Sequence, residues 1–157
     1  MSLKARVSQV WADRMQVAYR PPANYIVAAH NIFQIVGGPV WIKTIFCRFT
    51  IAEASTSTFA ITVAGIAMQN AAVNCDGAIN SIATWPLGAA AGQVIVPALL
   101  SQPPFSLANG LLGQVGQGQI SSVGMIVLTI AGANTDGAPE ICVAYHKMTP
   151  NSQIVVV

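Results

Sequence analysis

The sequence predicts an all-β fold, an antiparallel β-sandwich of jelly-roll-like type with a short helix or arm at its N-terminus. Short apolar segments recur along most of the chain, separated by turn residues such as Gly, Pro, Asn and Asp. Several segments alternate between apolar and other residues with the period of two that a strand requires. The length of 157 residues suits one domain with one core. We therefore divide the chain into an N-terminal element, residues 1–22, and a sandwich domain, residues 23–157.

The N-terminal element has the spacing of a short amphipathic helix that ends at Pro21 and Pro22. The apolar residues at this spacing are Val7, Val10, Trp11, Met15 and Ala18. The first twenty residues carry a net charge of +3, from four bases less one acid: Lys4, Arg6, Arg14 and Arg20 against Asp13. A basic end of this kind can dock on an acidic surface, and the same pattern also suits an ordinary solvated helix face.

Strands are predicted after Pro22. Ile32–Val36 is a short apolar strand, Gly37, Gly38 and Pro39 form a turn, and Val40–Ala52 is a long β-rich run. Alternation then predicts which side chains point toward the core. These residues are Ile45, Cys47, Phe49 and Ile51, followed by Phe59, Ile61 and Val63.

The middle of the chain has weaker strand signals. A turn at Asn74–Gly77 leads into a weak strand, Ala78–Trp85. Val94–Leu100 suits a strand that Pro97 restricts to a sheet edge. Ser101–Gln119 is rich in Gly, Gln and Pro and predicts a long surface loop.

Three segments complete the predicted sandwich. Val123–Ala131 is apolar at both alternating sets of positions, which indicates a strand covered on both faces. Asp136 and Gly137 have hairpin chemistry, because Asp-Gly tolerates the positive φ of tight turns. Ile141–Lys147 alternates again, and the apolar segment Ile154–Val157 is expected to pair within a sheet.

The composition is apolar and poor in charge, with 54% hydrophobic and 8% charged residues. It excludes disorder, which needs low hydrophobicity and high charge. It also suits an associating protein better than a free monomer. No membrane-spanning helix is expected, because prolines and glycines interrupt the uncharged stretch between Asp76 and Asp136, and no secretory signal is expected in Met1–Tyr19.

Residues for catalysis or metal binding are scarce. Cys47, Cys75 and Cys142 lie far apart, which predicts free thiols, with an intermolecular disulfide as the alternative. His30 and His146 lack a nucleophile motif, and the five acidic residues do not cluster. We therefore expect no enzymatic activity, no catalytic residues, no cofactor and no metal.

Five segments carry a resemblance to a known group of proteins. They are Ile32–Ile42 with its Gly-Gly-Pro turn, Asn74–Asp76, Gly124–Ile126, Asn134–Gly137 and Tyr145–Pro150. In this order they are similar to segments of small β-rich structural proteins of tailed-bacteriophage virions, of the head decoration or cement type. The resemblance covers roughly residues 30–152 and implies binding to the outer shell of the phage head, often as a trimer, without catalytic residues. Gly37, Gly38 and Pro39 match only as turn-formers.

The expected function is that of a non-enzymatic virion protein, made in the host cytoplasm and located on the capsid surface, that binds the major capsid protein and stabilises the assembled shell. A homo-oligomer is expected, with a trimer favoured. The net charge of +2 is too small to imply nucleic acid, and no membrane partner is expected. The residues expected to dock on the capsid are Lys4, Arg6, Trp11, Arg14 and Arg20.

Three other functions fit less well. The chain could be a tail, neck or fibre component of the same virion. It could instead be a carbohydrate-binding sandwich in which Trp41 and Trp85 stack on sugars, although packing of both residues in the core is the preferred interpretation. A small hydrolase is the third alternative.

Overall fold

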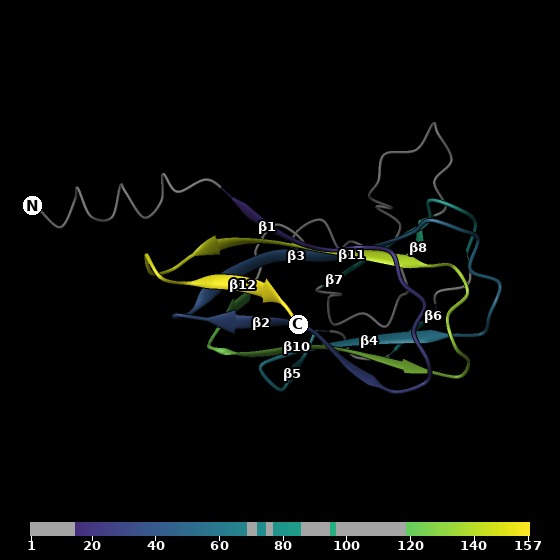
Figure 1. Ribbon diagram of the computed structural model, residues 1–157, viewed down its shortest axis with the longest axis horizontal. Coiled ribbons are helices and arrows are strands. Elements are labelled where there is room, and N and C mark those ends of the chain that lie inside the picture. The colour runs from purple at the N-terminus through teal and green to yellow at the C-terminus, as the bar shows by residue number, and fades with distance from the viewer. Residues whose placement is uncertain (1–14, 69–71, 75–76, 86–94, 97–118) are drawn as a thin grey trace, which may run out of the picture.

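The computed structural model describes residues 15–68, 72–74, 77–85, 95–96 and 119–157. These residues form two six-stranded antiparallel sheets that pack face to face (Figure 1). None of the described residues lies in a helix. The predicted all-β sandwich is therefore confirmed.

We call the two layers sheet A and sheet B. Sheet A has the order β1-β11-β3-β7-β8, with β9 paired to β3 beside this path. Its strands are β1 (Gln16–Arg20), β3 (Val40–Phe49), β7 (Ile82–Trp85), β8 (Ile95–Val96), β9 (Gln119–Ser121) and β11 (Pro139–Lys147). Sheet B has the order β12-β2-β10-β4-β5, with β6 paired to β4. Its strands are β2 (Ala29–Val36), β4 (Thr58–Val63), β5 (Ile66–Ala67), β6 (Val73–Asn74), β10 (Gly124–Ala131) and β12 (Gln153–Val156).

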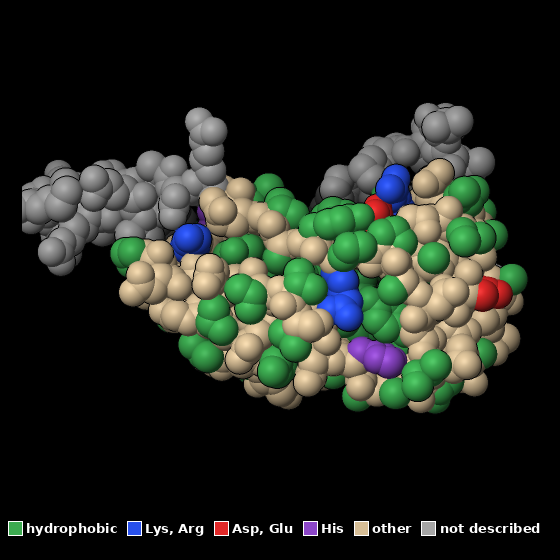
Figure 2. Space-filling model, viewed as in Figure 1, with side chains coloured by type: hydrophobic (Ala, Val, Ile, Leu, Met, Phe, Trp, Pro, Cys, Tyr) green, Lys and Arg blue, Asp and Glu red, His purple; other side chains and the backbone are tan. Residues whose placement is uncertain are grey.

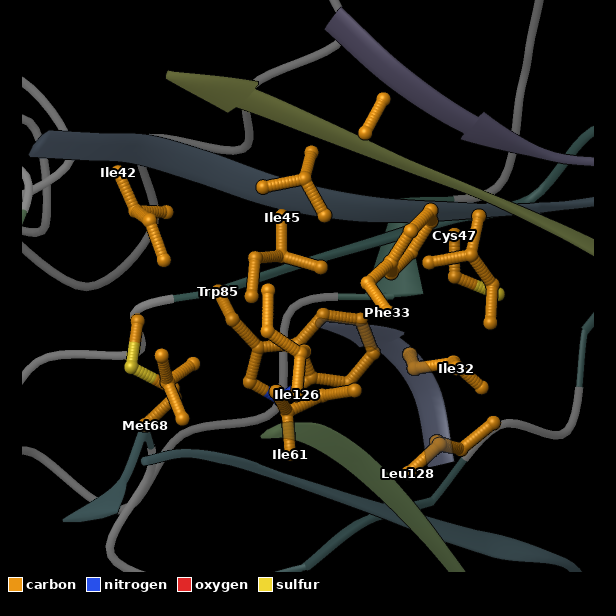
Figure 3. Packing of buried hydrophobic residues seen from close by; sticks show 14 of the residues in the cluster. Ile32, Phe33, Ile42, Ile45, Cys47, Ile61, Met68, Trp85, Ile126 and Leu128 are labelled. Atoms are coloured by element: carbon orange, nitrogen blue, oxygen red, sulfur yellow. The ribbon is translucent and has the colours of Figure 1, made fainter. Parts of the chain in front are cut away.

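One hydrophobic core fills the space between the sheets. Figure 3 shows Trp85 of β7 and Ile45 of β3 packed with Ile61 of β4 and Ile126 of β10. The inward residues predicted in β3 and β4 are at most 1% exposed: Ile45, Cys47, Phe49, Phe59, Ile61 and Val63. Ile51 is the exception at 56% exposed, because β3 ends at Phe49 and the alternation stops there.

The beginning of the described chain differs from the prediction. Residues 16–20, expected in a helix, form β1 and pair antiparallel with β11 along their whole length. Ala18 points into the core, whereas Val17 and Tyr19 point outward, as alternation in a strand requires. The helix prediction is therefore wrong for these five residues. The rest of the predicted helix, residues 1–14, lies outside the described residues.

β10 also differs from its prediction. It lies at the centre of sheet B, between β2 and β4, and buries Ile126, Leu128 and Ile130 in the core. Its other face, which includes Val127 and Thr129, is half-exposed on the outside of the sandwich. Within the described part of the chain no third layer covers that face, so the described residues cover β10 on one face only.

The hairpin predicted after β10 is a crossover instead. β10 belongs to sheet B and β11 to sheet A, so residues 132–138 cross from one layer to the other. The positive φ angles lie at Gly132 (+82°) and Ala138 (+43°), not at Gly137. Gly137 is needed because a Cβ atom there would lie 2.7 Å from Cδ1 of Phe49.

The other predicted turns and strands lie as follows. Gly37 and Gly38, with φ of +73° and +145°, join β2 to β3 ahead of Pro39. β12 pairs with β2, as expected for the apolar C-terminal segment. The weak strand Ala78–Trp85 is shorter than predicted, since β7 begins at Ile82.

Two predictions fall mostly on undescribed residues. From the predicted edge strand Val94–Leu100, the structure describes Ile95–Val96, which form β8 at the edge of sheet A. From the predicted loop Ser101–Gln119, it describes Gln119, where β9 begins.

Candidate interaction surfaces

The outer face of sheet B carries no formal charge. None of the six described strands in this sheet contains Asp, Glu, Lys or Arg. The partly exposed residues on this face are all uncharged: Gln34, Val36, Thr58, Ala60, Thr62, Met125, Val127, Thr129 and Val155. Figure 2, which views the sandwich from the side, shows few charged side chains among many hydrophobic and other uncharged ones. Such a face can be buried against another protein without removing a charge from water.

The outer face of sheet A, in contrast, carries a charged network across three strands. Arg48 of β3 forms an ion pair with Glu140 of β11, with 2.5 Å between Nε and Oε1. The hydroxyl of Tyr19 in β1 donates to Oε2 of Glu140 at 2.9 Å. This hydrogen bond to a carboxylate raises the pKa of Tyr19 above its ordinary value. Sheet A therefore presents an ion pair on its outer face, whereas the described strands of sheet B contain no Asp, Glu, Lys or Arg.

A second cluster on sheet A combines aromatic and basic side chains. Trp41 of β3 lies opposite His146 of β11, and their ring centroids are 5.7 Å apart. Nζ of Lys43 lies 3.9 Å from the centroid of the Trp41 ring, within the range of a cation–π interaction. Trp41 is half-buried here, whereas Trp85 is only 1% exposed in the core. The two tryptophans therefore do not form an exposed pair for stacking on a sugar.

One residue of the predicted docking arm, Arg20, is described, and its guanidinium contacts the protein itself. Nε donates to the hydroxyl of Tyr25 at 3.0 Å, and Nη1 donates to the backbone oxygens of Ile32 at 3.1 Å and Val157 at 2.5 Å. Arg20 thus links the end of β1 in sheet A to β2 and the end of β12 in sheet B. These three hydrogen bonds give Arg20 a structural role. Lys4, Arg6, Trp11 and Arg14 lie outside the described residues.

The connections between the layers are held by a buried carboxylate. Glu53, in the connection from β3 to β4, is 1% exposed. It accepts hydrogen bonds from the hydroxyls of Ser55 and Ser57, and from the backbone N–H groups of Asp136 (3.2 Å) and Gly137 (2.8 Å). Since four donors face its two oxygens, the carboxylate is satisfied without solvent. Glu53 therefore ties the crossover at 50–57 to the crossover at 132–138.

Asp136 adds a reciprocal contact between the same crossovers. Its Oδ1 accepts a hydrogen bond from the backbone N–H of Ala54 at 3.0 Å. This backbone hydrogen bond lowers the pKa of Asp136, because it favours the ionised carboxylate. Asp136 thus holds a loop position, which is the role expected of an aspartate at a turn.

The histidine and cysteine side chains that remain, His30, Cys47 and Cys142, lie in surroundings that suit a structural role. Nε2 of His30 lies 2.9 Å from the backbone oxygen of Ile26, and its ring meets Tyr25 edge-on. Among the described residues, Cys47 and Cys142 form no disulfide; Cys47 is buried in the core, and partial burial raises the pKa of Cys142. In the described part of the chain, no group of three or more His, Cys, Asp and Glu side chains is placed to hold a metal ion.

Two residues that organise the molecule had no role in the sequence prediction. Glu53 is one of the five acidic residues for which the sequence predicts no site, although the hydroxyls of Ser55 and Ser57, two and four positions later, are a local signal for a satisfied carboxylate. Tyr25 exchanges hydrogen bonds with Thr135, through its N–H to Oγ1 at 2.7 Å and its backbone oxygen to the Thr135 N–H at 2.9 Å. This second pairing spans most of the chain and leaves no local signal.

Comparisons with known proteins do not establish a family. No protein-family model matches the chain, and no curated protein matches it. One solved structure, described as infectious bursal disease virus Gx strain, is 12% identical to this chain, covers 92% of it, and has a TM-score of 0.20. The chain spans 38% of the length of that chain, and a TM-score this low does not show a common fold. No described helix is long and apolar enough to cross a membrane.

Proposed function

We propose that this chain is a non-enzymatic structural protein of a phage virion, a decoration protein that binds the assembled head shell through the major capsid protein and stabilises it. The observation that carries the proposal is the outer face of sheet B, where six strands present no formal charge. Natural soluble domains usually place charged residues on a solvent-facing sheet. An uncharged face instead suits permanent contact with another protein.

The stabilising effect follows from selective binding. A ligand that binds the assembled shell and not its separated subunits shifts the equilibrium toward the shell by mass action. Stable contact requires a large, well-packed interface. The small side chains of sheet B, such as Ala60, Thr62 and Thr129, allow a partner surface to approach the strands closely. The resemblance of residues 30–152 to phage head proteins points in the same direction.

A charge placed on the outer face of sheet B tests this proposal. Thr129→Lys puts an ammonium group at the middle of sheet B, and Thr84→Lys puts one on the outer face of sheet A, from an equally half-exposed threonine in β7. We expect Thr129→Lys to weaken co-sedimentation with heads purified without this chain by about tenfold or more, because an unpaired buried charge costs more than 1.4 kcal/mol. Thr84→Lys should bind like the wild type. Equal binding by both variants, with both folded by circular dichroism, would contradict the role of sheet B.

The contribution of the N-terminal arm is tested separately. The deletion should stop at residue 14, because residues 16–20 form β1 and their removal would disrupt sheet A. If Lys4, Arg6, Trp11 and Arg14 dock on the shell, the truncated chain should bind more weakly and with less dependence on salt. Unchanged binding would reject the arm.

The copy number of the chain on purified particles separates head decoration from a tail or neck role. Copies that follow the repeat of the shell support decoration, whereas copies confined to one vertex support a tail, neck or fibre component. A carbohydrate-binding role has less support, because Trp85, one of the two tryptophans it requires, is buried in the core.

A further inference from the structure

The edge strands of the two sheets are protected unequally against pairing with another chain. Among the described residues, the sheets end on one side of the sandwich in β8 and β5, which have two residues each. On the other side they end in β1, with five residues, and β12, with four. Very short edge strands are a common protection against pairing with another chain. Protection of this kind is present at β8 and β5 and missing at β1.

The side chains of β1 do not protect its edge either. Val17 is 59% exposed and Tyr19 is 47% exposed, and both are apolar or aromatic on the outer face of sheet A. The single charged residue of β1, Arg20, lies at its C-terminal end, and its guanidinium donates hydrogen bonds to Tyr25, Ile32 and Val157 of the same chain. A strand that exposes apolar side chains in this way is a template for another strand. From its length and from the exposure of Val17 and Tyr19 we propose that β1 pairs antiparallel with β1 of a second copy of this chain, so that sheet A continues across a two-fold axis.

The sequence of β1 is complementary to itself in this arrangement. With the axis at Ala18, Val17 lies opposite Tyr19 of the partner subunit, which makes two aromatic–aliphatic pairs of the kind that stabilise antiparallel strands. Arg20 lies opposite Gln16 of the partner subunit, so no like charges meet. The hydroxyl of Tyr19 is already bonded to Glu140, which orders the ring before association and reduces the entropy lost on pairing.

The neighbouring edge supplies further apolar surface on the same side. β1 and β12 run in the same direction along this side of the sandwich (Figure 1), and Arg20 joins their ends through the backbone oxygen of Val157. Val156 and Val157 are each 51% exposed. A second copy that pairs with β1 therefore approaches a second uncharged edge, and this association is independent of binding to a shell.

The test compares two lysine variants at equally exposed edge positions. Val17 in β1 and Ile66 in β5 are both 59% exposed. We expect the full-length wild type to sediment as a concentration-dependent dimer in analytical ultracentrifugation. Val17→Lys should raise the dimer dissociation constant about tenfold or more, since lysine is a natural protection of edge strands. Ile66→Lys should leave it unchanged, and circular dichroism should show both variants folded.

Hydrogen exchange assigns the contact to β1. Because alternate N–H groups of a strand point to opposite edges, the amides of β1 that point away from β11 should gain protection as the wild-type concentration rises, and Val17→Lys should lose that gain. A wild type that stays monomeric at all concentrations, a trimer mass, or equal weakening by Val17→Lys and Ile66→Lys would each overturn the two-fold pairing. Loss of dimerisation with normal binding to heads would leave the proposed function intact. Normal dimerisation without binding to heads would reject the proposed function and leave the β1 pairing intact.

Discussion

Sheet A and sheet B form one core together, but their outer faces differ in charge. All five charged residues that lie in described strands belong to sheet A: Arg20, Lys43, Arg48, Glu140 and Lys147. Sheet B has none, although it has the same number of strands. The low charge of the chain is therefore not spread evenly over its surface. The described strands of sheet B have no charged residue at all. This distribution is expected when the outer face of sheet A meets solvent and the outer face of sheet B meets a partner.

Core residues of the two sheets should contribute equally to the free energy of unfolding. Phe49 of sheet A and Phe59 of sheet B are both fully buried, with ring centroids 5.6 Å apart. We expect Phe49→Ala and Phe59→Ala each to lower the free energy of unfolding by about 3–5 kcal/mol. Because the two rings contact each other, the double variant should lose less than the sum. Urea denaturation measures all three values, and a large cost on one side only would show that one sheet dominates the core.

The carboxylate of Glu53, which connects the layers, should contribute more to stability than the partly buried carboxylate of Glu140 on the outer face of sheet A. Glu53→Gln replaces one acceptor oxygen with a donor that faces the N–H groups of Asp136 and Gly137, so we expect a loss of about 2–3 kcal/mol of stability. Glu140→Gln is the matched control. It breaks a partly exposed ion pair with Arg48 and should cost less than about 1 kcal/mol. Equal effects in chemical denaturation would show that the outer network of sheet A also holds the fold.

Acid should loosen the crossovers between the sheets through Asp136. Its pKa is lower in the folded chain, so its contribution to stability is present above the ordinary aspartate pKa and is lost as the pH falls through the folded value. Asp136→Asn retains an acceptor for the Ala54 N–H and cannot titrate. We expect the stability difference between wild type and Asp136→Asn to shrink as the pH falls below the ordinary aspartate pKa of about 4. A difference that stays constant over this range in urea titrations would contradict the role of the ionised group.

The smallest expected effect concerns the outer network of sheet A. Tyr19 has a raised pKa because its hydroxyl donates to Glu140. Glu140→Gln removes the negative charge, so the pKa of Tyr19 should fall toward its ordinary value. Difference absorbance of tyrosinate, with Tyr19→Phe to assign the signal, measures the change. No shift would show that the hydrogen bond does not persist in solution.

Local patterns predicted the inward residues well. Ile45, Phe49 and Ile61 could be placed in the core because alternation within one strand shows which face is apolar. The same method failed for residues 16–20, which follow on directly from a segment with helical spacing. Their strand depends on β11, and that partner is too far along the chain to leave a local signal.

The candidate surfaces were harder to predict than the core. The segments of sheet B are visibly free of charge in the sequence, but they form one face only because β12, β2, β10 and β4 assemble side by side. Gly137 was predicted for a hairpin, whereas its lack of a side chain makes room for Phe49 and Glu53 from another connection. The docking role of Lys4, Arg6, Trp11 and Arg14 stays a prediction.

The strand order has a consequence for biosynthesis. Sheet A receives β11 between β1 and β3, and sheet B receives β12 beside β2, so both layers are completed by residues 139–156. While the ribosome is still making this part, β2 lacks its partner β12 and β3 lacks its partner β11, so one edge of each strand has unpaired backbone groups. Contacts between residues so distant in sequence form slowly. Chains that stall before residue 139 should therefore aggregate or require a chaperone, whereas completed chains can close both layers in one late step.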